Sequence, residues 1–127
     1  MIMLYLLIFI FVAGIDVVTG SNVLATLLGL GDTKVDPEIL TNAMTVAAIV
    51  QGSLLMFAPR LSLKMYGTKD DSLYVRFHAE GTGAAVLTIG VECLCLFIMK
   101  LDTTKTFGLS SLVWSTEHVL ALAKRYW

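Results

Sequence analysis

Residues 39–59, ILTNAMTVAAIVQGSLLMFAP, decide the fold because they form a long apolar stretch without a single charged side chain. A helix needs about 20 mostly apolar residues to cross the hydrocarbon core of a bilayer. The stretch has this length, and it ends at Pro59 and Arg60, a pair that marks the limit of a helix. The sequence therefore predicts a membrane-spanning helix in this part of the chain.

A second apolar stretch covers residues 79–101. It contains Glu80 and Glu92, and Lys100 lies at its end, but its other residues are mostly apolar. Its length and composition again predict a membrane-spanning helix.

The two ends of the chain hold weaker candidates. Residues 2–19 contain one charge, Asp16, and are followed by Gly20, Ser21 and Asn22, which favour a turn. Residues 105–124 are the least apolar candidate, and Lys124, Arg125, Tyr126 and Trp127 follow as residue types that anchor a helix at the membrane interface.

Together these stretches predict an all-α integral membrane bundle of four helices in one domain, residues 1–127. The bundle has three spans if residues 1–31 or 105–124 lie along the surface. Of the 127 residues, 57% are hydrophobic and 15% charged. Soluble domains average about 45–50% apolar and about 25% charged residues, so both values point to lipid. The net charge of −1 leaves no basic surface of the kind that nucleic acid requires.

The N-terminal segment is expected to stay in the protein as a helix. A cleavable signal peptide begins with basic residues, whereas the first basic residue of this chain is Lys34. The alternative, that a targeting peptide has already been removed, is left open by the sequence.

Residues 60–67 are predicted to form a short amphipathic segment in the headgroup region, ended by Gly67. Asp70, Asp71 and Ser72 then favour the start of the next helix near residue 71, because acidic and hydroxyl side chains suit a helix N-terminus.

The distribution of basic residues predicts the orientation. With four spans, one side of the membrane holds Arg60, Lys64, Lys69, Arg76, Lys124 and Arg125, and the other holds Lys34, Lys100 and Lys105. The side richer in Lys and Arg is normally cytoplasmic. Both termini are therefore expected on the cytosolic, stromal or matrix side.

Polar and small residues recur at helical spacing within two of the predicted spans. Such a stripe normally faces other helices, while bulky apolar residues face lipid. In residues 79–101 and just before them, the stripe comprises His78, Gly81, Thr82, Ala85, Thr88, Ile89 and Glu92, and Gly83 and Ala84 add small residues. In residues 105–124 it comprises Ser110, Ser111, Trp114, Glu117, His118 and Ala121, and residues 39–59 contribute Ala48, Gln51 and Gly52.

Charged residues inside a membrane span are costly and suggest a function. Three interpretations are open. Asp16 and the other polar groups could satisfy one another structurally. Glu117 and His118 could act as base and acid in an enzyme or a proton pathway. Some groups could instead ligate chlorophyll magnesium or, for histidine, haem iron; the candidates are His118, His78, Glu92, Glu80, Glu117 and Gln51. No metal site is predicted. Cys93 and Cys95 do not match the C-x-x-C spacing and are interpreted as small apolar residues.

Residues 58–91 contain a sequence of elements that recurs elsewhere: Pro59 at a helix end, Met65-Tyr66-Gly67 after an amphipathic segment, then Arg76 and the glycine pair Gly81 and Gly83. In this the chain resembles the DoxX-like group and related small membrane proteins of unknown function. The resemblance covers about a quarter of the chain and implies a four-helix architecture without a defined site. His78-Ala79-Glu80 departs from the pattern, which has an apolar residue before the glycines.

The chain has no nucleophile motif and no phosphate loop, so we expect a non-catalytic accessory subunit of a large membrane complex. A photosystem in the thylakoid is preferred over a respiratory complex of the mitochondrial inner membrane, because His and Glu within spans can hold chlorophyll. Contacts with carotenoid, lipids and neighbouring subunits are then expected. The alternatives are a small membrane enzyme or transporter, in which Glu92, Glu117 and His118 would converge on a cavity, and an assembly factor.

Overall fold

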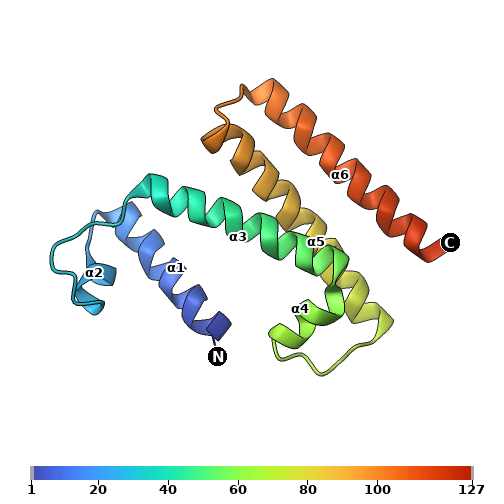
Figure 1. The fold of residues 1–127 in the computed structure, drawn as a ribbon, viewed down its shortest axis with the longest axis horizontal. Coiled ribbons are helices and arrows are strands. Elements are labelled where there is room, and N and C mark those ends of the chain that lie inside the picture. The colour runs from blue at the N-terminus through green and yellow to red at the C-terminus, as the bar shows by residue number, and fades with distance from the viewer. Residues whose placement is uncertain (1, 127) are drawn as a thin grey trace. The chain divides into compact units, whose positions relative to one another are not determined.

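The structure is a computed structural model that describes the backbone of residues 2–126 and the side chains of residues 5, 6 and 8–124 (Figure 1). The predicted interface anchors Arg125, Tyr126 and Trp127 lie outside the described side chains. The chain divides into two compact units, residues 1–43 and 44–127, which are described separately.

Every regular element in the described residues is a helix, as the sequence predicts. The elements are α1 (Ile2–Thr19), α2 (Val23–Leu27), α3 (Pro37–Phe57), α4 (Pro59–Met65), α5 (Leu73–Cys93), the π-helical turn η1 (Leu94–Ile98) and α6 (Thr103–Tyr126). Among the described residues, two helical stretches are long and apolar enough to cross a membrane, namely α3 and α5 continued through η1. Helices α1 and α6 coincide with the other two expected segments.

In the first unit, Asp16 and two glycines shape the chain after α1. The turn formers act as expected: α1 ends at Thr19, and Gly20 follows with a φ of +70°, a backbone conformation that glycine adopts without strain. Helix α2 begins three residues later. It ends at Leu27, and Gly29 follows at positive φ, while the N–H of Leu30 donates to the carbonyl of Ala25.

Helix α3 begins with a local capping arrangement. Pro37 occupies the first helical position, where its missing N–H costs nothing. Before it, a carboxylate oxygen of Asp36 accepts from the N–H of Glu38 at 2.8 Å, and the Asp36 carbonyl accepts from Leu40 at 3.0 Å. Residues 37–43 of this helix belong to the first unit and residues 44–57 to the second.

The second unit is built on a close contact between α3 and α5, made possible by glycines. A Cβ placed on Gly52 would lie 2.5 Å from the backbone nitrogen of Leu87, and one placed on Gly83 would lie 2.6 Å from that of Met56. A Cβ placed on Gly90 would lie 2.9 Å from the side-chain Cγ1 of Ile49 and 3.0 Å from its backbone nitrogen. The two backbones therefore approach as closely as small-residue interfaces of membrane helices allow.

This contact corrects the predicted stripe of α5. His78, Gly81, Thr82, Ala85 and Ile89 are exposed in the structure. Of the small residues named in the sequence analysis, Gly83 and Ala84 are buried as expected, and the other buried positions are Ala79 and Gly90. The reason is that α5 contacts α3 along the residues where the two backbones can approach each other closely. These residues include Gly83 and Gly90 and not the polar residues of the stripe.

Helix α6 packs antiparallel beside α5 in the same unit (Figure 1). Its inward side holds Thr106, Ser110 and Glu117, which are buried, while Trp114 and His118 are exposed. The predicted stripe of α6 is therefore half right. Its exposed members lie beside the buried ones on the helix surface rather than on the contact itself.

The segment between α3 and α5 follows the prediction closely. Helix α4 covers most of residues 60–67 and ends at Met65. Gly67 follows at a φ of +76°, and the N–H of Thr68 donates to the carbonyl of Leu63. Ser72 caps α5 by accepting from the N–H of Val75 at 3.3 Å. Helix α5 thus starts at Leu73, close to the expected residue 71.

The end of the second long helix is a π-helical turn. The N–H of Met99 donates to the carbonyl of Leu94 at 2.9 Å, which is the i to i−5 bond of a π-helix. Lys100 then adopts a φ of +55° and ends the helix where the sequence places its limit. Cys95 is buried and Cys93 half-buried, and both are free thiols.

Candidate functional site

Glu117 is the most deeply buried acidic side chain of the second unit. It lies on α6 with 3% of its surface exposed. Its Oε2 lies 3.3 Å from the hydroxyl of Thr88 on α5, and its Oε1 is buried with no hydrogen-bond partner among the described residues. The Thr88 hydroxyl also donates to the carbonyl of Ala84 at 2.9 Å. Since a hydroxyl has one proton, it cannot donate both bonds at once, and Glu117 is incompletely satisfied.

His118, the next residue, is held in a defined orientation on the outer side of α6. Its Nδ1 lies 2.8 Å from the carbonyl oxygen of Trp114, and its ring lies 4.0 Å from the Trp114 ring, centre to centre. A carbonyl can only accept, so Nδ1 carries the proton in this bond. In the neutral imidazole, Nε2 is then the nitrogen with a free lone pair.

A small pocket of about 110 Å³ joins these residues. Its walls are mostly apolar, and the residues that line it are Met56, Phe77, Glu80, Gly81, Ala84, Glu117, His118 and Ala121. The structure therefore brings together three of the predicted site residues, Glu80, Glu117 and His118. The pocket is far too small for a pigment and suits one or a few small molecules.

Glu92 lies elsewhere. It is half-buried and lines a separate, more open pocket with Thr88, Phe107, Ser110, Ser111, Trp114 and Ser115. The enzyme alternative predicts that Glu92, Glu117 and His118 converge on one cavity. In the structure, Glu92 lines a different pocket from Glu117 and His118.

Gln51 and His78 make local contacts instead. The Gln51 amide donates to the Tyr66 hydroxyl, which connects α3 to the residue that ends α4. His78 is exposed, and its ring makes an edge contact with Tyr74 at 4.3 Å between centres. Neither side chain lines the pocket of Glu117.

Asp16 has a structural role in the first unit. Only 2% of its surface is exposed. One carboxylate oxygen accepts from the Ser21 hydroxyl and from the N–H of Val23 at 3.0 Å, and the other accepts from the N–H of Leu24 at 2.8 Å. These N–H groups open α2 and have no partner within that helix. The charge in α1 thus caps the following helix.

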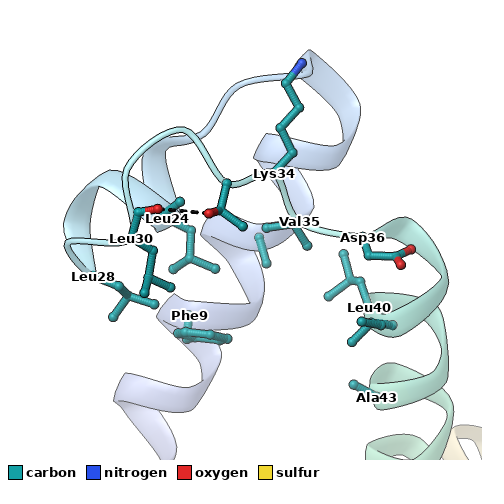
Figure 2. Close-up of a pocket in the computed structure, with 13 residues that line it drawn as sticks. Phe9, Leu24, Leu28, Leu30, Lys34, Val35, Asp36, Leu40 and Ala43 are labelled. Carbon is teal, nitrogen blue, oxygen red and sulfur yellow. Dashed lines mark hydrogen bonds between the residues drawn. The ribbon is translucent and has the colours of Figure 1, made fainter.

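The first unit also contains an apolar pocket of about 280 Å³ (Figure 2). Phe9 of α1, Leu24 of α2 and Leu40 of α3 contribute to its walls, and the Lys34 side chain extends away from it in the view of Figure 2. Near its rim, the Thr33 hydroxyl donates to the Leu30 carbonyl at 2.9 Å. The pocket is mainly apolar, and Thr33, Lys34 and Asp36 are the polar residues among those that line it.

Two features could not be read from the sequence as a site. Asp71 forms ion pairs with Arg60 at 3.3 Å and with Arg76 at 3.4 Å, and so links the start of α4 to the first turn of α5. Lys124, near the end of α6, reaches the carbonyl of Met56 on α3. In the sequence, the signal for this feature is the group of basic residues Arg60, Lys64, Lys69 and Arg76 between two apolar stretches. Within residues 2–126, no group of three or more His, Cys, Asp or Glu side chains is arranged to hold a metal ion.

Comparisons of the chain with protein-family models, with curated proteins and with solved structures found no match. The resemblance to the DoxX-like group therefore stays a prediction from residues 58–91.

Proposed function

We propose that this chain is a non-catalytic accessory subunit of a larger membrane protein complex, with four membrane-spanning helices and both termini on the same side. The observation that carries the proposal is the large number of bulky apolar side chains exposed on the long helices. They include Phe9, Phe11 and Ile15 on α1, Ile39, Val46 and Val50 on α3, and Phe107, Leu112, Trp114, Val119 and Leu122 on α6.

The exposed apolar surface suits contact with lipid or with neighbouring subunits. Soluble monomers rarely expose large contiguous apolar patches, and surfaces that do so bind a membrane or another protein. Meanwhile several buried polar groups are engaged inside the fold itself, with Asp16 capping α2 and Thr88 contacting Glu117. These polar groups interact with other groups inside the fold, and the apolar side chains are exposed. Such a subunit is suited to packing against lipid or neighbouring subunits.

The finer proposal is a photosystem subunit in the thylakoid, with a respiratory complex of the mitochondrial inner membrane as the second choice. It rests on His118. A histidine that binds a metal usually gives its other ring N–H to a carbonyl or carboxylate, which fixes the ring and leaves the second nitrogen for the metal. The bond to the Trp114 carbonyl and the exposure of His118 fit this role toward chlorophyll magnesium on the outer side of α6. Carotenoid would then contact the exposed apolar faces.

A second candidate is a small membrane enzyme or transporter, favoured by the unpartnered Oε1 of Glu117 next to Glu80 and His118 in one pocket. Such a site could bind a small cation or exchange a proton. The separate location of Glu92 and the small pocket volume make this the weaker candidate. The third candidate is an assembly factor. It would use the same exposed apolar faces but would bind a complex only transiently.

Native-gel migration of the endogenous protein, with identification of co-migrating proteins and an absorption spectrum of the band, tests the proposal. We expect co-migration with a large complex at fixed stoichiometry in its mature form. Migration of the protein by itself, without a partner, would overturn the proposal. Presence only in immature forms of a complex would indicate an assembly factor instead.

Two pairs of variants separate the finer versions. His118→Leu should remove pigment from the subunit and leave co-migration intact, whereas the matched variant His78→Leu, on the exposed start of α5, should change neither. Retention of all pigment in His118→Leu would refute ligation by this residue. Loss of a catalytic or transport activity in Glu117→Gln, with normal assembly, would favour the enzyme or transporter.

A further inference from the structure

Three cationic side chains from three helices surround one pocket of the second unit. Arg60 comes from the start of α4, Arg76 from the first turn of α5 and Lys124 from near the end of α6. The pocket has a volume of about 420 Å³, and its walls are Phe57, Ala58, Pro59, Arg60, Leu61, Leu73, Arg76, Phe77, Glu80 and Lys124.

The two arginines are held in place by a shared carboxylate. Asp71 contacts Arg60 at 3.3 Å and Arg76 at 3.4 Å, and all three side chains retain access to solvent, with 65% of Arg60 and 29% of Arg76 exposed. Each guanidinium has five N–H donors, while Asp71 has two oxygens to share between them. The ion pairs therefore orient both arginines and leave donors for another anion.

Lys124 is positioned by the end of α3. Its ammonium group lies 3.4 Å from the carbonyl oxygen of Met56 and 5.5 Å from the centre of the Phe57 ring. The carbonyls of a last helical turn lack partners within the helix and carry partial negative charge, and an aromatic face attracts a cation. Both contacts keep the charge of Lys124 at the rim of the pocket.

The charge of the pocket and its apolar walls define the ligand. Three cations face two carboxylates, Asp71 beside the pocket and Glu80 in its wall, which leaves a positive excess. The neighbouring apolar walls are open to the surroundings: Phe57, Leu61, Leu73 and Phe77 are all exposed. A ligand that fits has an anionic group at one end and hydrocarbon directly attached to it.

The position of the pocket agrees with this ligand. It lies where α3 ends and α5 begins, the two helical stretches that are long and apolar enough to cross a membrane. Basic pockets between membrane helices at the membrane surface are typical binding sites for anionic lipid headgroups.

We propose that this pocket binds the headgroup of an anionic glycerophospholipid, with the phosphate between Arg60, Arg76 and Lys124 and the acyl chains along Phe57, Leu61, Leu73 and Phe77. The inference rests on the membrane location in the proposed function and not on the identity of the partner complex. Absence of lipid selectivity, together with normal co-migration on a native gel, would therefore contradict this lipid site and leave the proposed function standing.

Native mass spectrometry of the full chain in a neutral detergent tests the site. The protein is titrated with dioctanoyl phosphatidylglycerol, with the zwitterionic dioctanoyl phosphatidylcholine, and with inorganic phosphate. We expect selective binding of one phosphatidylglycerol. A basic residue near an anionic lipid surface contributes enough that each of Arg60→Gln and Lys124→Gln should weaken this binding about fivefold.

Lys105→Gln is the matched control, since Lys105 lies at the other end of α6 and is paired with Asp102 at 3.3 Å. It should leave the selectivity unchanged. Lys124→Gln lies outside the ion pairs of Asp71, so it tests the site even if Arg60→Gln disturbs the loop. Equal binding of both lipids, displacement of the lipid by equimolar phosphate, or an equal loss in Lys105→Gln would each overturn the proposal.

Discussion

Asp16 and Glu117 are both buried carboxylates on apolar helices, one in each compact unit, yet their surroundings differ. Asp16 receives three hydrogen bonds, two of them from backbone N–H groups that open α2. Glu117 has one contact, with a Thr88 hydroxyl that is also bonded to Ala84, and its second oxygen has no partner among the described residues.

The difference shows that burial alone does not tell a structural charge from a functional one. A carboxylate that satisfies backbone donors is part of the fold, because its removal leaves buried N–H groups unpaired. A carboxylate with a free oxygen beside a pocket contributes little to folding and keeps an oxygen for a ligand. The following variants test this comparison.

The largest effect is expected for Asp16→Ala. The N–H groups of Val23 and Leu24 would lose their acceptor, and unpaired buried donors should lower the free energy of unfolding by about 2–4 kcal/mol. Unfolding by sodium dodecyl sulfate in mixed micelles, followed by circular dichroism, measures the change. Asp16→Asn keeps one acceptor oxygen and should lose less.

The counterpart is Glu117→Met, which has a similar volume and no charge. Replacing an incompletely satisfied buried charge by an apolar side chain is often neutral or stabilising, so a change below about 1 kcal/mol is expected. If Glu117→Met destabilises the protein as much as Asp16→Ala, the two carboxylates do not differ in role.

An effect smaller than that of Asp16→Ala is expected where the second unit depends on close packing instead of a buried charge. A Cβ on Gly83 would meet the backbone of Met56 and the carbonyl of Gly52, so Gly83→Ala should force α3 and α5 apart and cost about 1–3 kcal/mol in the same assay.

Gly81→Ala is the matched control for this variant. It lies two residues away on the same helix, and a Cβ there would meet nothing within 4 Å. Since alanine favours helix over glycine by up to about 1 kcal/mol, Gly81→Ala should be neutral or stabilising. Equal destabilisation by both variants would argue against the glycine contact.

The smallest effect extends the comparison to an exposed capping carboxylate, Asp102, just before α6. The N–H of Lys105 donates to it at 2.9 Å, and this bond holds the pKa of the Asp102 carboxyl below its ordinary value. A lowered pKa in the folded state means that the group stabilises the fold above the unfolded pKa, near about 4. This contribution is lost as the pH falls through the folded value.

Thermal unfolding of the wild type and of Asp102→Asn at a series of pH values measures this effect. Asparagine also caps a helix but does not titrate, so the advantage of the wild type should shrink below about pH 4. A constant difference between the two proteins across this range would contradict the role of Asp102.

Much of the helical architecture could be predicted from the sequence. The apolar stretch at residues 39–59 became α3, and the turn formers follow the end of α1 at Thr19. Gly67 follows the end of α4, and Ser72 caps the start of α5. Each of these depends on length, local capping or a single backbone conformation, all of which are encoded by neighbouring residues.

The site was harder to predict. The sequence singled out Glu117 and His118, which line one pocket, but it grouped them with Glu92, which lines a different pocket. Three-residue spacing places residues on one side of a helix without stating which neighbouring helix they meet. The polar stripe of α5 was wrong for the same reason.

The sequence by itself determined that this chain is helical, where most of its helices begin and end, and that two of them are long and apolar enough to cross a membrane. Only the tertiary structure decided that Gly83 and Gly90 contact α3, that Asp16 caps α2, and that Arg60, Arg76 and Lys124 meet at one pocket. Local properties depend on adjacent residues, whereas these contacts depend on which segments distant in the chain come together.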